Sequence, residues 1–155
     1  MQIKGVTGIG SILKVLLEVC FFLGIVFLLA LYFIVKLVGI HFNLFIGCVY
    51  PCGIAFLYLV WQFIGLFASL KEESPFVEEN PLRMKKGMIA SLIIAFFTGV
   101  ALLLTILVYN YYTLQLQVAL GFIMVLFIGV GIALYILKEL FSEAILYKNE
   151  NDLTI

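Results

Sequence analysis

The side chain in the least expected chemical setting in this sequence is Glu18, whose carboxylate lies about one turn inside the first long apolar stretch. A carboxylate in such surroundings is costly and usually has either a partner or a function. Glu18 is therefore a proton or ion site, or an interfacial carboxylate paired with Lys14, four residues earlier, or with Lys138. We favour the paired carboxylate, because a side chain near a helix end reaches the interface cheaply and no deeper acid continues a relay.

Three cysteines and one histidine are the other candidates for metal binding or nucleophilic chemistry. Cys48 and Cys52 share a helix face, Cys20 lies in another apolar stretch, and His41 lies in a short connection. A zinc site needs further ligands, and thiols in apolar stretches usually behave as small hydrophobic groups. The sequence also contains no Ser-His-acid set, no His-Glu-x-x-His motif and no phosphate-binding glycine loop. It therefore predicts no metal site, no cofactor and no enzyme activity.

The composition identifies the class of protein to which these residues belong. Of 155 residues, 65% are hydrophobic and 12% are charged, whereas a soluble domain is about half apolar and about a quarter charged. A lipid bilayer would cover apolar surface that so short a soluble chain cannot bury. The net charge is zero, so no direct binding of nucleic acid is expected.

Four apolar stretches are each long enough to cross the bilayer, which takes about 20 residues in a helix. They predict an all-α polytopic membrane protein of one domain, residues 1–155, whose helices span about 13–38, 44–70, 88–109 and 118–137. The helices form two hairpins joined by a polar loop at 69–87. The tail, 138–155, is predicted to continue helix four as an amphipathic extension to about Lys148.

Small residues predict which helix faces meet, because they let helix backbones approach closely in lipid. Ser91, Ala95 and Gly99 recur at four-residue spacing and are expected to pack against a matching row on helix four. That row consists of Gly121, Val125, Gly129 and Ala133.

Basic residues set the expected orientation. Of nine Lys and Arg residues, all except Lys36 lie near the two ends of the chain or in the loop at 69–87. Because cytoplasmic segments of membrane proteins are enriched in such residues, both termini and this loop are predicted to be cytoplasmic.

The polar loop has readable local features. Asn80-Pro81 predicts a helix start, since Asn caps helices and Pro fits the first helical position. Arg83, Lys85 and Lys86 would then lie near anionic headgroups. Phe76 and Val77 either dip into the interface or a groove, or belong to an ordinary solvated connection.

The loop SPFVEENPLRMKKG and the ending YKNENDLTI together resemble the domain of unknown function 2975 family. The loop has that family's Pro-Phe, Glu-Asn, Leu and basic residues, with Pro81 as a departure, and the resemblance covers essentially the whole chain. The family implies a bacterial inner-membrane protein whose gene often neighbours one for a small helix-turn-helix protein. The resemblance thus implies a membrane-tethered protein that docks or sequesters such a regulator. The expected contacts are Phe76, Glu78, Glu79, Asn80, Glu150, Asn151, Asp152, Leu153, Thr154 and Ile155.

Other functions are compatible with the same sequence. A small transporter, channel or immunity protein acting within the bilayer would depend on Glu18, Pro51 and the outer-facing polar residues, and a pore would require a homo-oligomer. The chain could also be a structural subunit of a larger membrane complex. Finally, the loop and tail could pack only on each other.

Overall fold

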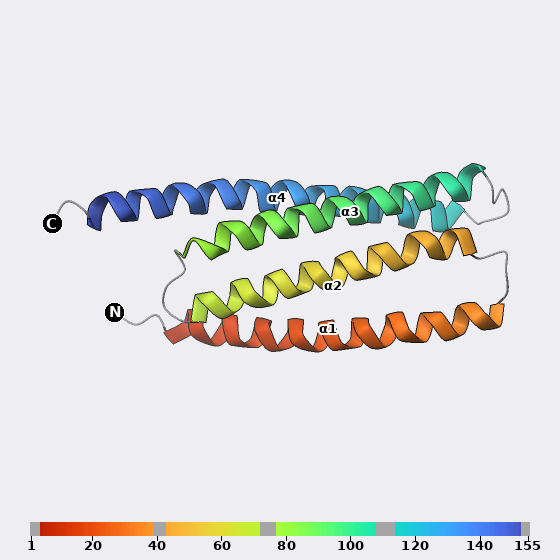
Figure 1. The fold of residues 1–155 in the computed structure, drawn as a ribbon, viewed down its shortest axis with the longest axis horizontal. Coiled ribbons are helices and arrows are strands. Elements are labelled where there is room, and N and C mark those ends of the chain that lie inside the picture. Colours follow the sequence, from red (N-terminus) through yellow and green to blue (C-terminus); the bar gives the residue numbers. More distant parts are fainter. Residues whose placement is uncertain (1–3, 39–42, 72–76, 108–113, 153–155) are drawn as a thin grey trace.

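The computed structural model describes residues 4–38, 43–71, 77–107 and 114–152, all but two of them in four α-helices. These are α1 (Lys4–Val38), α2 (Asn43–Lys71), α3 (Glu79–Leu107) and α4 (Leu114–Asp152). Each contains a segment long and apolar enough to cross a membrane. The all-α, four-span fold predicted from the sequence is confirmed (Figure 1).

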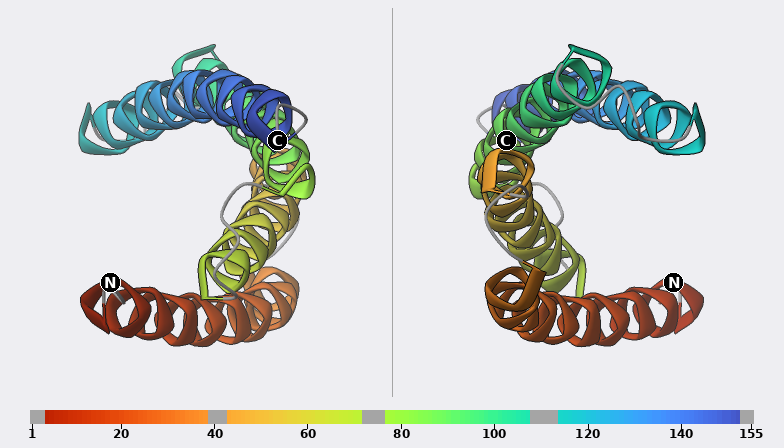
Figure 2. Two further views of the ribbon diagram at one scale, coloured as in Figure 1. Left: turned by 90° about the vertical axis from the view of Figure 1, so that its left-hand side faces the viewer. Right: turned by 90° about the vertical axis from the view of Figure 1, so that its right-hand side faces the viewer.

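The helices pack in the order of the chain. The main contacts join α1 to α2, α2 to α3 and α3 to α4, and α1 has no comparable contact with α4. Figure 2 shows the result as an open C, in which α1 and α4 are the arms and α2 and α3 are the back. The interior of the C is consequently open on one side.

The two ends of this bundle differ in what they carry. The start of α1, the end of α2, the start of α3 and the end of α4 all lie at one end, which we call the terminal end (Figure 1). The last turns of α4 project beyond the other three helices there. The described parts of both polar motifs, residues 77–87 and 147–152, therefore belong to the terminal end.

α3 is the most enclosed helix of the four, with 39% of its membrane-span window buried against none for α1. Eight of its ten buried positions alternate between spacings of four and three residues: Asn80, Met84, Gly87, Ser91, Ile94, Thr98, Ala101 and Thr105. The less exposed positions of α4 follow the same pattern: Leu120, Met124, Phe127, Gly131, Leu134, Lys138, Phe141 and Ile145. This repeat of 3.5 residues is the pattern of coiled-coil packing, here between antiparallel helices.

Small residues permit the close approach of these helices. Gly131 is buried, and a Cβ added there would lie 2.9 Å from the Ser91 Oγ. The predicted face of α3 is confirmed at two positions, since Ser91 lies against Gly131 and Gly99 against Met124 of α4. The predicted face of α4 is wrong, because Gly129 is exposed and a Cβ there would meet no other atom within 4 Å. A row at four-residue spacing drifts around the helix, whereas the seam repeats every 3.5 residues.

The hydroxyls along α3 form hydrogen bonds within their own helix. Ser91, Thr98 and Thr105 donate to backbone carbonyls three or four residues earlier, at 2.7–2.8 Å. Such bonds satisfy a hydroxyl where no water is available. These side chains can therefore pack against α2 and α4 as small groups without needing a polar partner from either.

Helix bounds extend beyond the predicted spans at several points. α1 begins at Lys4 rather than at about residue 13, and α3 begins at Glu79, two residues before Pro81. α4 is continuous from Leu114 to Asp152, past the end expected at Lys148. Polar residues at the helix ends remain helical in water, so the lengths of the apolar spans alone underestimate the lengths of the helices.

Candidate functional site

Those of the predicted partner-binding residues that the structure describes gather at the terminal end. Glu78, Glu79 and Glu150 are exposed. Asn151 and Asp152 belong to the last turn of α4. Phe76, Leu153, Thr154 and Ile155 lie outside the described residues.

Asn80 differs from its acidic neighbours, because it is only 1% exposed. Its side-chain Oδ1 lies 2.9 Å from the Ser69 Oγ, which is also 2.7 Å from the Leu66 carbonyl. Its backbone N–H donates to the Val77 carbonyl at 3.0 Å. Asn80 thus ties the start of α3 to the end of α2, and its side chain is not presented at the surface.

The projecting part of α4 follows from the register of the α3–α4 seam. Gly87 lies against Leu134 and Gly131 against Ser91, so Glu79 is level with about residue 142. The remaining residues of α4 extend about 15 Å beyond α3 at 1.5 Å per residue. On this segment Leu146 and Tyr147 are 62% and 69% exposed, while Ile145 is buried.

The amphipathic extension predicted for this tail has an apolar stripe, which is only partly present as one face: Leu137, Leu140, Phe141, Ala144 and Ile145. Phe141 and Ile145 turn inward, and Phe141 packs against the core. Leu137 and Leu140 are 41% and 56% exposed. The inward positions continue the seam with α3, which leaves the outer positions of the stripe uncovered.

A second feature of the terminal end is a groove of about 680 Å³ between α1, α2 and α3. Five charged residues line it, and we call it the charged groove: Lys14, Glu18, Glu79, Arg83 and Lys86. The predicted pairing of Glu18 with Lys14 is present, with 3.8 Å between Oε1 and Nζ. The alternative pairing is absent, since Lys138 bonds to Glu139 at 2.7 Å.

Arg83 is held in the charged groove from two sides. Its Nη2 donates to the Glu79 Oε2 at 3.1 Å. Its guanidinium also lies directly against α2 at Gly65, where a Cβ would collide with it. Glycine at this position therefore creates the space that Arg83 fills.

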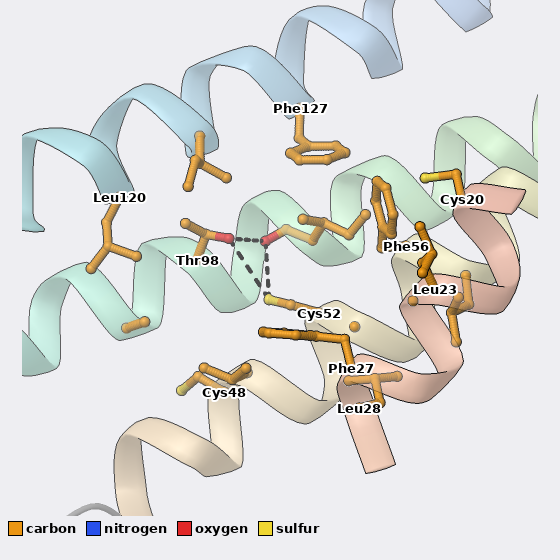
Figure 3. Close-up of a pocket in the computed structure, with 17 residues that line it drawn as sticks. Cys20, Leu23, Phe27, Leu28, Cys48, Cys52, Phe56, Thr98, Leu120 and Phe127 are labelled. Carbon is orange, nitrogen blue, oxygen red and sulfur yellow. Dashed lines mark hydrogen bonds between the residues drawn. The ribbon is translucent and has the colours of Figure 1, made fainter. Parts of the chain in front are cut away.

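A third feature is an apolar cleft of about 590 Å³ to which all four helices contribute (Figure 3). All three cysteines line it, together with aromatic side chains such as Phe27, Phe56 and Phe127. The Cys52 Sγ lies 3.7 Å from both the Ile94 carbonyl and the Thr98 hydroxyl. Among the described residues, no group of three His, Cys, Asp or Glu side chains comes together as a metal site would require.

Sequence reasoning missed the charged groove as a unit. It placed Arg83 and Lys86 near headgroups and paired Lys14 with Glu18, yet it did not bring these groups together. The available signal was Gly65, which has no side chain and lies near the end of α2 that adjoins the polar loop. The helix after that loop begins with charged residues. Only the register between helices turns that signal into a site.

These features define an integral membrane protein with four spans, an open apolar cleft and a charged terminal end. A family model described as "Protein of unknown function (DUF2975)" matches residues 5–155, and the chain belongs to this family. No curated protein and no solved structure matches the chain.

Proposed function

We propose that this protein is a membrane-tethered regulatory protein that docks or sequesters a small helix-turn-helix regulator at the cytoplasmic face of the bacterial inner membrane. The observation that carries the proposal is the projecting end of α4. It extends the chain beyond the bilayer-spanning bundle and exposes Leu146 and Tyr147 next to acidic residues. Exposed aromatic side chains flanked by charges are typical anchors of protein interfaces.

The charges of the terminal end suit a DNA-binding partner. Glu78, Glu79, Glu143 and Glu150 are exposed carboxylates at this end. A helix-turn-helix protein carries a basic surface for phosphates, and such carboxylates would compete for it. The tail residues Asn151 to Ile155 and the loop residue Phe76 remain part of the proposed contact surface. Asn80, being buried, would instead hold the loop in place.

The proposed orientation follows from the bases at the same end. Arg83, Lys85, Lys86 and Lys148 belong to the terminal end, which the enrichment of Lys and Arg in cytoplasmic segments assigns to the cytoplasm. In this proposal the protein carries out no catalysis; it acts by binding. The alternative, a small transporter, channel or immunity protein, would depend on Glu18. The Lys14–Glu18 ion pair favours a structural role for that carboxylate.

The proposal is tested by co-purification of the intact protein in detergent with the helix-turn-helix protein of a neighbouring gene. We expect the regulator to be retained and to be lost when residues 149–155 are removed. A second variant, Tyr147→Ala, should weaken retention by about tenfold or more, as expected for an anchor residue worth over about 1.4 kcal/mol. Phe122→Ala is the matched control, because Phe122 is equally exposed on α4 but lies toward the opposite end.

Two results of this experiment would refute the proposal. If the intact protein never retains the regulator, or if Tyr147→Ala and Phe122→Ala behave alike, docking through the projecting end of α4 is refuted. Circular dichroism of each variant shows whether the membrane domain is still helical.

A further inference from the structure

The charged groove brings together residues that lie far apart in the sequence. Contacts of Gly24 with Leu57 and of Gly53 with Leu28 fix the register of α1 on α2. That register puts Lys14 and Glu18 level with residues 63–67 of α2. The Ser69–Asn80 contact and the approach of Gly87 to Leu59 put Glu79, Arg83 and Lys86 at the same level.

The groove has an excess of positive charge once its internal pairs are counted. Glu18 faces Lys14, and Glu79 faces Arg83. Lys86 lines the groove and has no ion pair among the described residues. Arg83 uses one nitrogen for Glu79, and a guanidinium carries five N–H donors in a rigid fork. Lys86 and the remaining donors of Arg83 are therefore available to an anion.

Gln62 gives an independent indication that the groove receives a polar group. It is 9% exposed and lines the groove, and its side chain makes no hydrogen bond among the described residues. Among the described residues, no side-chain nitrogen or oxygen that is shielded from solvent lacks a hydrogen-bond partner. Because the Gln62 amide has no such partner, it must be accessible from the groove. A polar group in the groove can therefore reach the Gln62 amide and would replace water as its hydrogen-bond partner.

The remaining wall of the groove is aromatic. Trp61 is 58% exposed, and its ring lies 5.8 Å from that of Phe21, which also lines the groove. Tryptophan is enriched where membranes meet water, because one part of the ring is apolar and its N–H is polar. The groove thus combines cations and an amide with an apolar wall, at the end of membrane-spanning helices.

We propose that the charged groove binds the headgroup of an anionic phospholipid. The phosphate contacts Arg83 and Lys86, the Gln62 amide donates to a headgroup oxygen, and the glycerol region lies along Trp61 and Phe21. Basic pockets between membrane helices bind anionic headgroups in this way. Gly65 leaves room for the Arg83 guanidinium and Glu79 bonds to it, so its position is already fixed before a ligand arrives. Little side-chain conformational freedom is therefore lost on binding. The inference does not depend on docking of a regulator.

The test is native mass spectrometry of the full-length protein in detergent, titrated with phosphatidylglycerol or with phosphatidylcholine. We expect phosphatidylglycerol to bind more tightly. Lys86→Ala should weaken that binding about fivefold, the factor corresponding to about 1 kcal/mol per basic residue. The control is Lys85→Ala, because Lys85 is the neighbouring exposed cation and does not line the groove. Equal affinity for both lipids, or equal effects of the two substitutions, would overturn the proposal.

Two further variants separate the groove from general surface charge. Gln62→Leu removes the amide at similar volume, and Gly65→Val displaces the Arg83 guanidinium without changing the net charge. Both should weaken phosphatidylglycerol binding several-fold, whereas unchanged affinity in both would refute the site. Inorganic phosphate serves as a third probe. If it binds as tightly as the lipid, the groove is a site for free phosphate and the lipid assignment is wrong.

Discussion

The tight contact of Gly131 on α4 with Ser91 on α3 predicts a large effect for adding a single methyl group there. In Gly131→Ala the new Cβ would lie 2.9 Å from the Ser91 Oγ, about half an ångström inside ordinary van der Waals contact. Ser91 is fully buried, and its hydroxyl donates to the Met88 carbonyl. The hydroxyl can therefore move only by breaking that bond or by pushing the helices apart. We expect unfolding to become easier by about 1–3 kcal/mol, the usual cost of overpacking.

The same helix provides a matched control for this prediction. Gly129 is exposed, and a Cβ there meets no other atom within 4 Å. Gly129→Ala should leave stability unchanged or raise it by up to about 1 kcal/mol, because alanine favours helix over glycine. The assay is the free energy of unfolding in mixed detergent micelles, followed by circular dichroism.

A second substitution tests whether the Ser91 contact is the cause. Ser91→Ala removes the Oγ that the new Cβ would meet, so the double variant Gly131→Ala/Ser91→Ala should recover most of the loss. The coupling between the two changes should be favourable by about 0.5–3 kcal/mol, as for residues in direct contact. Equal stability of the Gly131 and Gly129 variants, or additive effects in the double variant, would refute the assignment of the seam.

Three further predictions follow from the fold. Leu134 is 4% exposed in the core cluster, so Leu134→Ala should cost about 2–5 kcal/mol in the same unfolding assay; a loss below about 1 kcal/mol would contradict the α3–α4 seam. Asn80→Leu removes the amide that faces the Ser69 hydroxyl and should cost about 1–3 kcal/mol; an unchanged unfolding curve would refute the link between α2 and α3. Single cysteines introduced at Glu143 and Leu114, with the native cysteines replaced by alanine, should be labelled by an impermeant thiol reagent from opposite sides of the membrane. Labelling of Glu143→Cys in intact cells would contradict the cytoplasmic terminal end.

The sequence predicts the class of fold well because length and hydropathy alone decide it. The ends of α1 and α2 fall at Val38 and Lys71, within one residue of the expected bounds, since charges and polar residues mark them. The start of α3 was expected from Pro81 and lies two residues earlier. Local chemistry of this kind is visible in one sequence, because capping and hydropathy are properties of neighbouring residues.

Contacts between helices were harder to predict because they depend on register and crossing. The row through Gly129 and the seam through Gly131 both contain a glycine among apolar residues, and in lipid hydropathy does not distinguish a buried face from a lipid-facing one. Gln62 and Gly65 do not predict a site by themselves; they become part of one because the register between helices brings Arg83 and Lys86 to the same groove. Asn80 was expected both to start a helix and to bind a partner, and its burial supports the structural role.

The central proposal, docking of a helix-turn-helix regulator, is tested most directly by competition with DNA. The intact protein in lipid nanodiscs is titrated into a complex of the regulator with its labelled DNA site, and the bound DNA is followed by fluorescence anisotropy. We predict that the protein releases the DNA, and that the combined substitutions Glu78→Gln, Glu79→Gln and Glu150→Gln weaken this release by tenfold or more, about 1.4 kcal/mol. DNA that stays fully bound at saturating concentrations of the intact protein would contradict the proposal.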